Sequence, residues 1–146
     1  MFCGMDNLTS HQRSYCMSRI RSKDTSPEII VRRLSHRMGY RFRLHRSDRP
    51  GRPDLTFPKL KKVIFVHGCF WHSHNCRRGT VKPKTNATYW KAKRERTLNR
   101  DKKNLKNIES LGWQSLVIWE CEVNELLHLE EKISDFFNSR NLEAND

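Results

Sequence analysis

The sequence contains no apolar run that approaches the roughly 20 residues needed to cross a bilayer. Residues Met1 to Leu8 lack the basic and then apolar layout of a secretory signal. There are no internal repeats and no low-complexity tracts, which excludes a repeat architecture. With 146 residues, of which 36% are hydrophobic, the chain suits one soluble domain. We therefore predict a cytoplasmic protein with no membrane partner.

Acidic residues are scarce through most of the chain. The 146 residues carry a net charge of +13. From Glu109 onward the chain has nine acidic residues and only two basic ones, Lys132 and Arg140, which gives a net charge of −7. The first 108 residues therefore carry +20. Such a field attracts polyanions, and counterion release from phosphates supplies affinity. We predict a nucleic-acid partner; anionic lipid or plain solubility are the alternatives, but no basic amphipathic helix stands out.

Local signals predict an α/β or α+β fold with a mixed central sheet flanked by helices. Ser26 is expected to cap a first helix, with Pro27 at its first position, Glu28 in its first turn and Gly39 at its end. The expected elements after it are strands over 40–45, 54–57 and 61–66, a helix over 87–111, a strand over 113–120 and a helix over 123–137. We divide the chain into a basic arm at 1–23, one domain at 24–138 and a tail at 139–146.

The five cysteines are an odd number, and without a secretory signal we do not expect a disulfide framework. Cys69, His74 and Cys76 lie close together in sequence and supply three zinc-type ligands. Cys121 follows a later predicted strand, and neighbouring strands bring their ends together, so it is the best fourth ligand. A closed tetrahedral set of this kind predicts a structural zinc site. The alternative is a set of buried free thiols beside coincidental histidines.

A turn at Gly51-Arg52-Pro53 delivers Asp54 to the start of a strand. A Pro-Asp followed by a short triplet on the next strand is the layout of PD-(D/E)xK nucleases, in which carboxylates bind magnesium and a lysine assists the water. Here Phe65 stands where the second acid is expected, and His67 where the lysine is expected. Taken alone, a Pro-Asp turn is more often structural.

Aromatic residues and histidines outside these patterns divide into two groups. Phe70 and Trp71 are adjacent in a basic loop, where on an extended segment both could not be buried, so we predict that they act as wedges in a base stack. Trp113 and Trp119 are expected in the core. Four histidines have no partner evident in the sequence and are expected at the surface: His11, His36, His45 and His128.

Three blocks of the chain, taken in order, resemble the signature blocks of the very-short-patch repair (Vsr) endonucleases. They are Gly51 to Asp54, the run from Val63 to Trp71 with His72 and Cys76, and Trp119-Glu120-Cys121. The resemblance extends from Thr9 to Phe137 and implies a restriction-endonuclease-like fold. It also implies an enzyme that nicks one strand of duplex DNA beside the thymine of a T:G mismatch, the lesion left when 5-methylcytosine deaminates.

The resemblance assigns roles in a magnesium site. Asp54 matches a magnesium-binding aspartate, and Val66 matches a position whose backbone carbonyl also meets the metal. His72 matches the histidine that activates the attacking water, and His67 one that lies against the phosphate. This division of work suits phosphodiester hydrolysis, in which a metal polarises the phosphoryl oxygen while a base near neutral pKa takes a proton.

Two acids and one aromatic residue gain roles only through the resemblance. Glu28 and Asp101 match acids that complete the site by holding metal-bound waters or orienting a histidine. Without the resemblance, Glu28 would be interpreted as an acid that is favoured in the first turn of a helix. Asp101 would be interpreted as a charge on the helix surface. Trp90 joins Phe70 and Trp71 as an expected DNA-intercalating residue. Ser73 and Asn75 interrupt a longer histidine run of the family.

The sequence therefore predicts a magnesium-dependent DNA endonuclease with a structural zinc ion, acting as a monomer on double-stranded DNA with a T:G mismatch. A bacterial, nucleoid-associated enzyme with mismatch-repair proteins as candidate partners follows from the resemblance. Two alternatives stay open. One is a nicking or restriction-type endonuclease of the same fold with another target, and the other a zinc-stabilised DNA-binding protein without catalysis.

Overall fold

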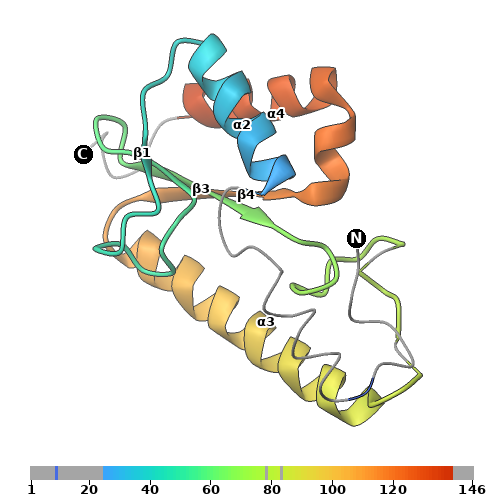
Figure 1. The fold of residues 1–146 in the computed structure, drawn as a ribbon. Coiled ribbons are helices and arrows are strands. Elements are labelled where there is room, and N and C mark those ends of the chain that lie inside the picture. The colour runs from blue at the N-terminus through green and yellow to red at the C-terminus, as the bar shows by residue number, and fades with distance from the viewer. Residues whose placement is uncertain (1–8, 10–24, 78, 83, 140–146) are drawn as a thin grey trace.

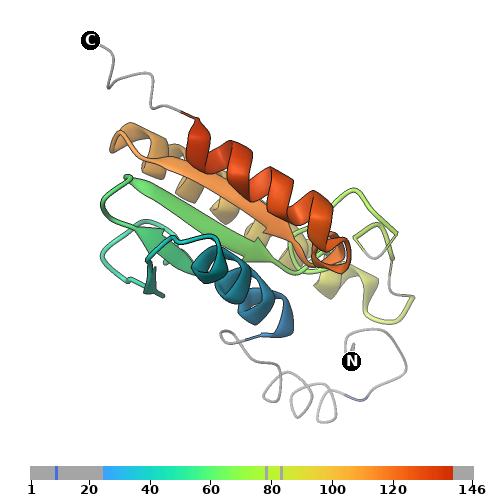
Figure 2. The ribbon, with the colours of Figure 1, turned by 90° about the horizontal axis from the view of Figure 1, so that it is seen from above.

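A computed structural model describes residue 9 and residues 25–77, 79–82 and 84–139. A four-stranded sheet has helices on both faces, α2 (Ser26–Arg37) and α4 (Leu126–Asn138) on one and α3 (Ala87–Ser110) on the other (Figures 1 and 2). The predicted mixed sheet flanked by helices is confirmed. The arm over 1–23, apart from Thr9, and all but the first residue of the tail lie outside the described residues. In the part described, no helix is long and apolar enough to cross a membrane.

The sheet has the order β1 (Arg43–Leu44), β2 (Leu55–Phe57), β3 (Lys62–His67) and β4 (Gln114–Trp119). The first three strands pair antiparallel, and β4 runs parallel to β3. Because β3 and β4 are parallel, their carboxyl ends lie at the same edge of the sheet. That edge carries the loop after β3 and the short 3-10 helix η1 (Glu120–Asn124) after β4.

Side chains of β3 alternate between the two faces of the sheet, as the period of a strand requires. Ile64 belongs to the core under α2 and α4. Val63 and Phe65 belong to a smaller core with Ile108 of α3 and Trp113. Both faces of this strand are covered, which explains its continuous apolar run. At the end of β3 the alternation turns Val66 and His67 toward opposite faces.

Helix α2 begins one residue earlier than its sequence signal suggested. The N-cap is Thr25 rather than Ser26, and Glu28 at the third helical position accepts the Thr25 backbone N–H at 3.4 Å. Gly39 ends the helix with φ +94°, as predicted. Its N–H donates to His36 and that of Tyr40 donates to Ser35, the paired bonds of a Schellman motif.

Two other predicted boundaries were wrong. The strand expected over 40–45 is reduced to Arg43–Leu44, because Tyr40 and Phe42 pack their rings on Phe137 and Phe57 instead of joining the ladder. The last helix begins at Leu126 instead of Val123. The Glu122 carboxylate accepts the Trp119 N–H at 3.0 Å, which holds this corner as a separate 3-10 turn.

Candidate functional site

The Asp54 carboxylate is held at the edge between β2 and β3. Its Oδ2 accepts the backbone N–H of Val66 at 2.6 Å. Burial raises the pKa of Asp54 to about 6, the Val66 N–H opposes this shift, and the nearby Glu28 charge adds to it. Asp54 is therefore a partly buried carboxylate whose negative charge a nearby cation would stabilise.

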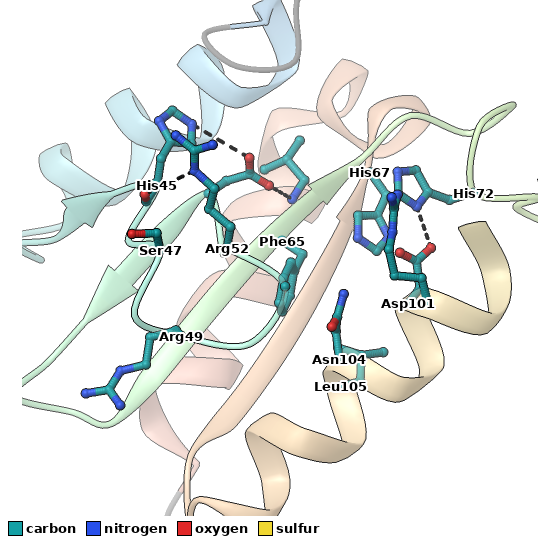
Figure 3. A pocket seen from close by; sticks show the side chains of 14 residues that line it. His45, Ser47, Arg49, Arg52, Phe65, His67, His72, Asp101, Asn104 and Leu105 are labelled. Carbon is teal, nitrogen blue, oxygen red and sulfur yellow. Dashed lines mark hydrogen bonds and ion pairs between the residues drawn. The ribbon is translucent and has the colours of Figure 1, made fainter. Parts of the chain in front are cut away.

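A cavity of about 660 Å³ opens beside Asp54. Its walls come from the β1–β2 turn, the end of β3, the following loop and α3 (Figure 3). The lining residues are His45, Ser47, Arg49, Gly51, Arg52, Asp54, Phe65, Val66, His67, His72, Arg100, Asp101, Asn104 and Leu105. Five residues predicted as catalytic or magnesium-binding therefore line one cavity. They are Asp54, Val66, His67, His72 and, from α3, Asp101.

Glu28, the remaining predicted acid, lies behind Asp54. Its side chain is 2% exposed, and its Oε1 accepts a hydrogen bond from Arg32 at 2.7 Å. His45 is in contact with the same oxygen, and its Nε2 lies 3.8 Å from Asp54 Oδ1. Glu28, His45 and Asp54 therefore form a compact group of possible metal-binding side chains.

His45 is the cavity residue that the sequence reasoning missed, because the surface position predicted for it was wrong. Its backbone N–H donates to the Asp54 carbonyl at 3.3 Å, directly beyond the Leu44–Leu55 pair of the β1–β2 ladder. A register for the predicted hairpin would have placed His45 beside Asp54, and that was the available signal. His36 and His128 are exposed, as predicted, whereas His11 lies outside the described residues.

A second acid–histidine group occupies the α3 side of the cavity. The Nδ1 of His72 lies 2.5 Å from Asp101 Oδ2. The ring of His67 stacks on that of His72, with centroids 3.8 Å apart and planes 4° apart. Burial, and then the neighbouring His72, lower the pKa of His67 to about 4. The view that Asp101 is a surface charge is therefore wrong, because its carboxylate turns into the cavity to meet His72 (Figure 3).

Positive side chains surround the cavity. Arg52 donates from Nε to the His45 carbonyl at 3.4 Å, and Arg49 places its guanidinium 4.2 Å from the Trp113 ring centroid. Arg100 is exposed on α3 at the opposite wall. Gly51 packs so closely on Asn104 of α3 that an added Cβ would lie 2.9 Å from the Asn104 Cβ. A cavity lined by buried acid–histidine groups under an arginine rim suits a phosphodiester.

The four residues predicted as zinc ligands come together at the shared edge of β3 and β4. Cys69, His74, Cys76 and Cys121 each bring one ligand atom within 4.8 Å of the others. Cys121 Sγ lies 3.6 Å from His74 Nδ1. Burial raises the pKa of the Cys69 thiol to about 12. Three sulfurs and one imidazole nitrogen fit the tetrahedral preference of zinc, which would hold the thiols as thiolates.

The backbone around this cluster is closely fitted. His74 N–H donates to the Cys69 carbonyl at 2.9 Å, and Gly79 N–H donates to Cys76 Sγ at 3.4 Å. A Cβ on Gly79 would lie 1.7 Å from the His74 carbonyl oxygen, so only glycine fits. Trp119 stacks on His74 at 4.1 Å and meets His67 edge-on at 5.3 Å. Trp119 is half-buried between the two sites, not in the core as predicted, whereas Trp113 is in the core.

The aromatic residues predicted as wedges form one packed cluster. Phe70 and Trp90 are 0% and 1% exposed, and only Trp71 is half-buried. The segment is not extended: His72 N–H donates to Gly68 and Ser73 N–H to Phe70, so the chain turns and brings both rings onto Trp90. As expected, the two adjacent rings are not both buried, but burial of Phe70 and Trp90 in the core argues against the wedge role predicted for these two residues. Trp71 is the ring of the three that reaches solvent.

Sequence comparisons give this site a context. The profile of the family described as DNA mismatch endonuclease Vsr matches residues 5–78. The Type II nicking enzyme V.XorIIP of Xanthomonas oryzae pv. oryzae is 45% identical over 133 residues, 91% of this chain and 97% of the relative. The Type II nicking enzyme V.NmeAIP of Neisseria meningitidis is 37% identical, over 88% and 91%. The DNA mismatch endonuclease Vsr of Escherichia coli is 37% identical, over 84% and 76%.

Proposed function

Since this chain belongs to the Vsr family of DNA endonucleases, we propose that it nicks one strand of duplex DNA at T:G mismatches, using magnesium. The family makes it a DNA endonuclease. The names of the Xanthomonas and Neisseria relatives support cutting of a single strand. The name of the Escherichia coli relative supports a mismatch as the target. The proposed target is the T:G pair that deamination of 5-methylcytosine leaves in DNA.

One observation carries the catalytic part of the proposal: two acid–histidine groups face one another across a single cavity. Asp54 lies on one wall with Glu28 and His45 behind it, and the pair His72–Asp101 lies on the other. Cleavage of a phosphodiester needs charge stabilisation on one side of the phosphorus and a base for water on the other. A protein that only binds DNA has no need of this pairing.

His72 has the geometry of the general base. A carboxylate accepts hydrogen bonds and does not donate them, so Asp101 fixes the proton of His72 on Nδ1. The Nε2 of the same ring is then a lone-pair acceptor for a water proton. Asp101 also stabilises the imidazolium that forms once that proton has moved. His67 stays neutral because its pKa is low, and it is placed to hydrogen-bond a phosphate without competing for the proton.

The residues on the other wall fit magnesium. Asp54 offers a partly buried carboxylate whose pKa is raised chiefly by burial, and oxygen ligands of this kind are what magnesium prefers. We expect Asp54 and the Val66 backbone carbonyl to hold the ion, with Glu28 completing its surroundings. Bound there, magnesium would polarise a phosphoryl oxygen and stabilise the developing negative charge. The layout supports a variant PD-(D/E)xK site in which His72 takes over the work of the missing lysine.

We further propose that Cys69, His74, Cys76 and Cys121 bind one structural zinc ion. The cluster joins the loop after β3 to η1, and the same loop carries His72. A zinc ion at this point would fix the loop and so keep the catalytic imidazole against Asp101. The basic residues of α3 and the preceding loop would lie along the DNA phosphates, positioning the duplex without reading its sequence.

A strand-resolved nicking assay tests the proposed function. Duplexes carry a T:G pair or the matched T:A and C:G pairs, with each strand labelled in turn, and magnesium is either added or omitted. We expect a single cut in the thymine strand of the T:G duplex, dependent on magnesium. Asp54→Ala should abolish this cut and preserve DNA binding, while Asp135→Ala, an exposed acid of α4, should leave it intact. Equal cutting of matched duplexes would overturn the mismatch assignment, and binding without cutting would overturn catalysis.

A further inference from the structure

His45 belongs to a group of three side chains that could bind a metal ion. Neither its sequence neighbourhood nor the roles proposed above account for its place in that group. Glu28, His45 and Asp54 each bring one donor atom within 4.8 Å of the other two. The side chain of His45 is 13% exposed, that of Glu28 2% and that of Asp54 19%. The three come from α2, the end of β1 and the start of β2, so the tertiary fold alone assembles them.

The imidazole of His45 is held in place by its backbone. The residue has φ +47°, in the left-handed region that histidine adopts more readily than most residues other than glycine. Its N–H donates to the Asp54 carbonyl, and its own carbonyl accepts Arg52 Nε at 3.4 Å. These contacts fix the ring beside Asp54, where Nε2 faces both carboxylates.

The charges of this group favour a ligand that adds no charge of its own. Arg32 already pairs with Glu28 at 2.7 Å, which leaves about one uncompensated negative charge, on Asp54. A neutral imidazole offers a lone pair without further repulsion between anions. Carboxylate and carbonyl oxygens suit magnesium and manganese, whereas an imidazole nitrogen suits transition-metal ions and not magnesium. The group therefore includes a nitrogen ligand that a site for magnesium alone does not need.

We propose that His45 is a nitrogen ligand, together with Asp54 and Glu28, of a divalent-cation site that accepts a first-row transition ion such as Mn²⁺. This inference rests on the proposed magnesium site but concerns its ligands and ion selectivity. His45 Nε2 and Glu28 Oε1, which are in contact with each other here, would both serve as donor atoms to the ion. Manganese should therefore bind more tightly than magnesium, and it should support nicking.

Electron paramagnetic resonance of Mn²⁺ added to the purified full-length protein, without DNA, tests the ligand directly. We expect one Mn²⁺ site, a ¹⁴N coupling from a bound imidazole, and displacement by magnesium only at higher concentration. His45→Ala should remove the nitrogen coupling and weaken Mn²⁺ binding about 10- to 100-fold. His128→Ala, which removes an exposed histidine of α4, is the matched control and should change neither.

The wild-type spectrum decides the matter even if His45→Ala is unstable. Bound Mn²⁺ without a nitrogen coupling, or a coupling that survives in His45→Ala and in the more conservative His45→Gln, would overturn the proposal. Absence of any Mn²⁺ binding would also overturn it. Nicking of T:G duplexes with magnesium is measured separately, so its failure would count against the proposed function and not against the ligand assignment.

Discussion

The imidazole rings of His67 and His72 are stacked face to face, with centroids 3.8 Å apart and planes 4° apart. Two parallel imidazoles at this distance repel strongly when both are protonated. Asp101 hydrogen-bonds His72, and His67 is the more buried of the two rings. In the mechanism that we propose, the positive charge therefore forms on His72 as the base, and His67 serves as a neutral phosphate contact.

His67 should stay neutral well below the ordinary range of histidine. Its pKa is lowered to about 4, first by burial and then by His72. Because the unfolded chain takes up this proton near pH 6.5, the native state gains about 3 kcal/mol from His67 above that pH and loses it as the pH falls toward 4. Imidazole NMR shifts of His67, followed from pH 8 to pH 5, should not move. A midpoint near 6.5 would contradict the assignment, and exposed His36 supplies the normal titration for comparison.

Asp101→Asn should slow the chemical step and leave DNA binding nearly unchanged. The amide still accepts the His72 Nδ1–H but no longer stabilises an imidazolium, so we expect kcat to fall about 10- to 100-fold. Single-turnover nicking and a binding titration separate these two quantities, and Asp135→Asn on α4 is the control. A loss of binding equal to the loss of rate would show that Asp101 only supports the fold.

Asp54→Asn should stabilise the protein at pH 8 when no magnesium is added. The folded-state pKa of Asp54 is raised to about 6 by burial, so its contribution to stability is present below the unfolded value of 3.8 and is lost as the pH rises through 6. Above pH 7 the ionised carboxylate costs about 3 kcal/mol, which a neutral amide avoids. Thermal unfolding at pH 8 and pH 5 should show a higher Tm for the variant at pH 8 and a smaller difference at pH 5. Equal Tm values at pH 8 would contradict this account.

Cys121→Ser should remove zinc and stability together. The thiol closes the four-residue cluster from η1, and a structural zinc site contributes directly to folding. Elemental analysis and thermal unfolding of the same preparations provide the two readouts. Wild-type protein without zinc would refute the metal, whereas a fully zinc-loaded Cys121→Ser would refute only this ligand.

Trp71→Ala and Phe70→Ala should fail in different ways. Trp71 reaches solvent, and stacking on a base is worth roughly 1–3 kcal/mol, so its loss should weaken binding to T:G duplexes about 5- to 150-fold and to matched duplexes much less. Phe70 is 0% exposed under Arg94 and against Trp90, so Phe70→Ala should cost about 3–5 kcal/mol of folding free energy. Titrations at one salt concentration and thermal unfolding distinguish the two. Equal losses on both duplexes for Trp71→Ala would make it a packing residue.

Much of the fold could be predicted from local signals. Within the strand predicted over 61–66, residues 63–66 are apolar on both faces because helices cover both, and Gly39 and Gly112 end their helices with positive φ. The strand over 40–45 could not be predicted correctly, because the packing of Tyr40 on Phe137 is a contact across the whole domain. Helix starts differed from the predicted ones by one to three residues, at places where a glutamate side chain accepts a backbone N–H.

The sequence by itself determined the chemistry available to this protein. The +20 charge of the first 108 residues, the ligands Cys69, His74 and Cys76, and the Pro-Asp turn at residue 54 all follow from residue types and spacing. Which side chains lie together depends on the tertiary fold, although the sequence already favoured Cys121 as the fourth ligand. The parallel pairing of β3 and β4 brings Cys121 to the cluster, and the β1–β2 register brings His45 to Asp54. Such pairs depend on strand register and helix packing, which contacts distant in sequence fix and no local pattern encodes.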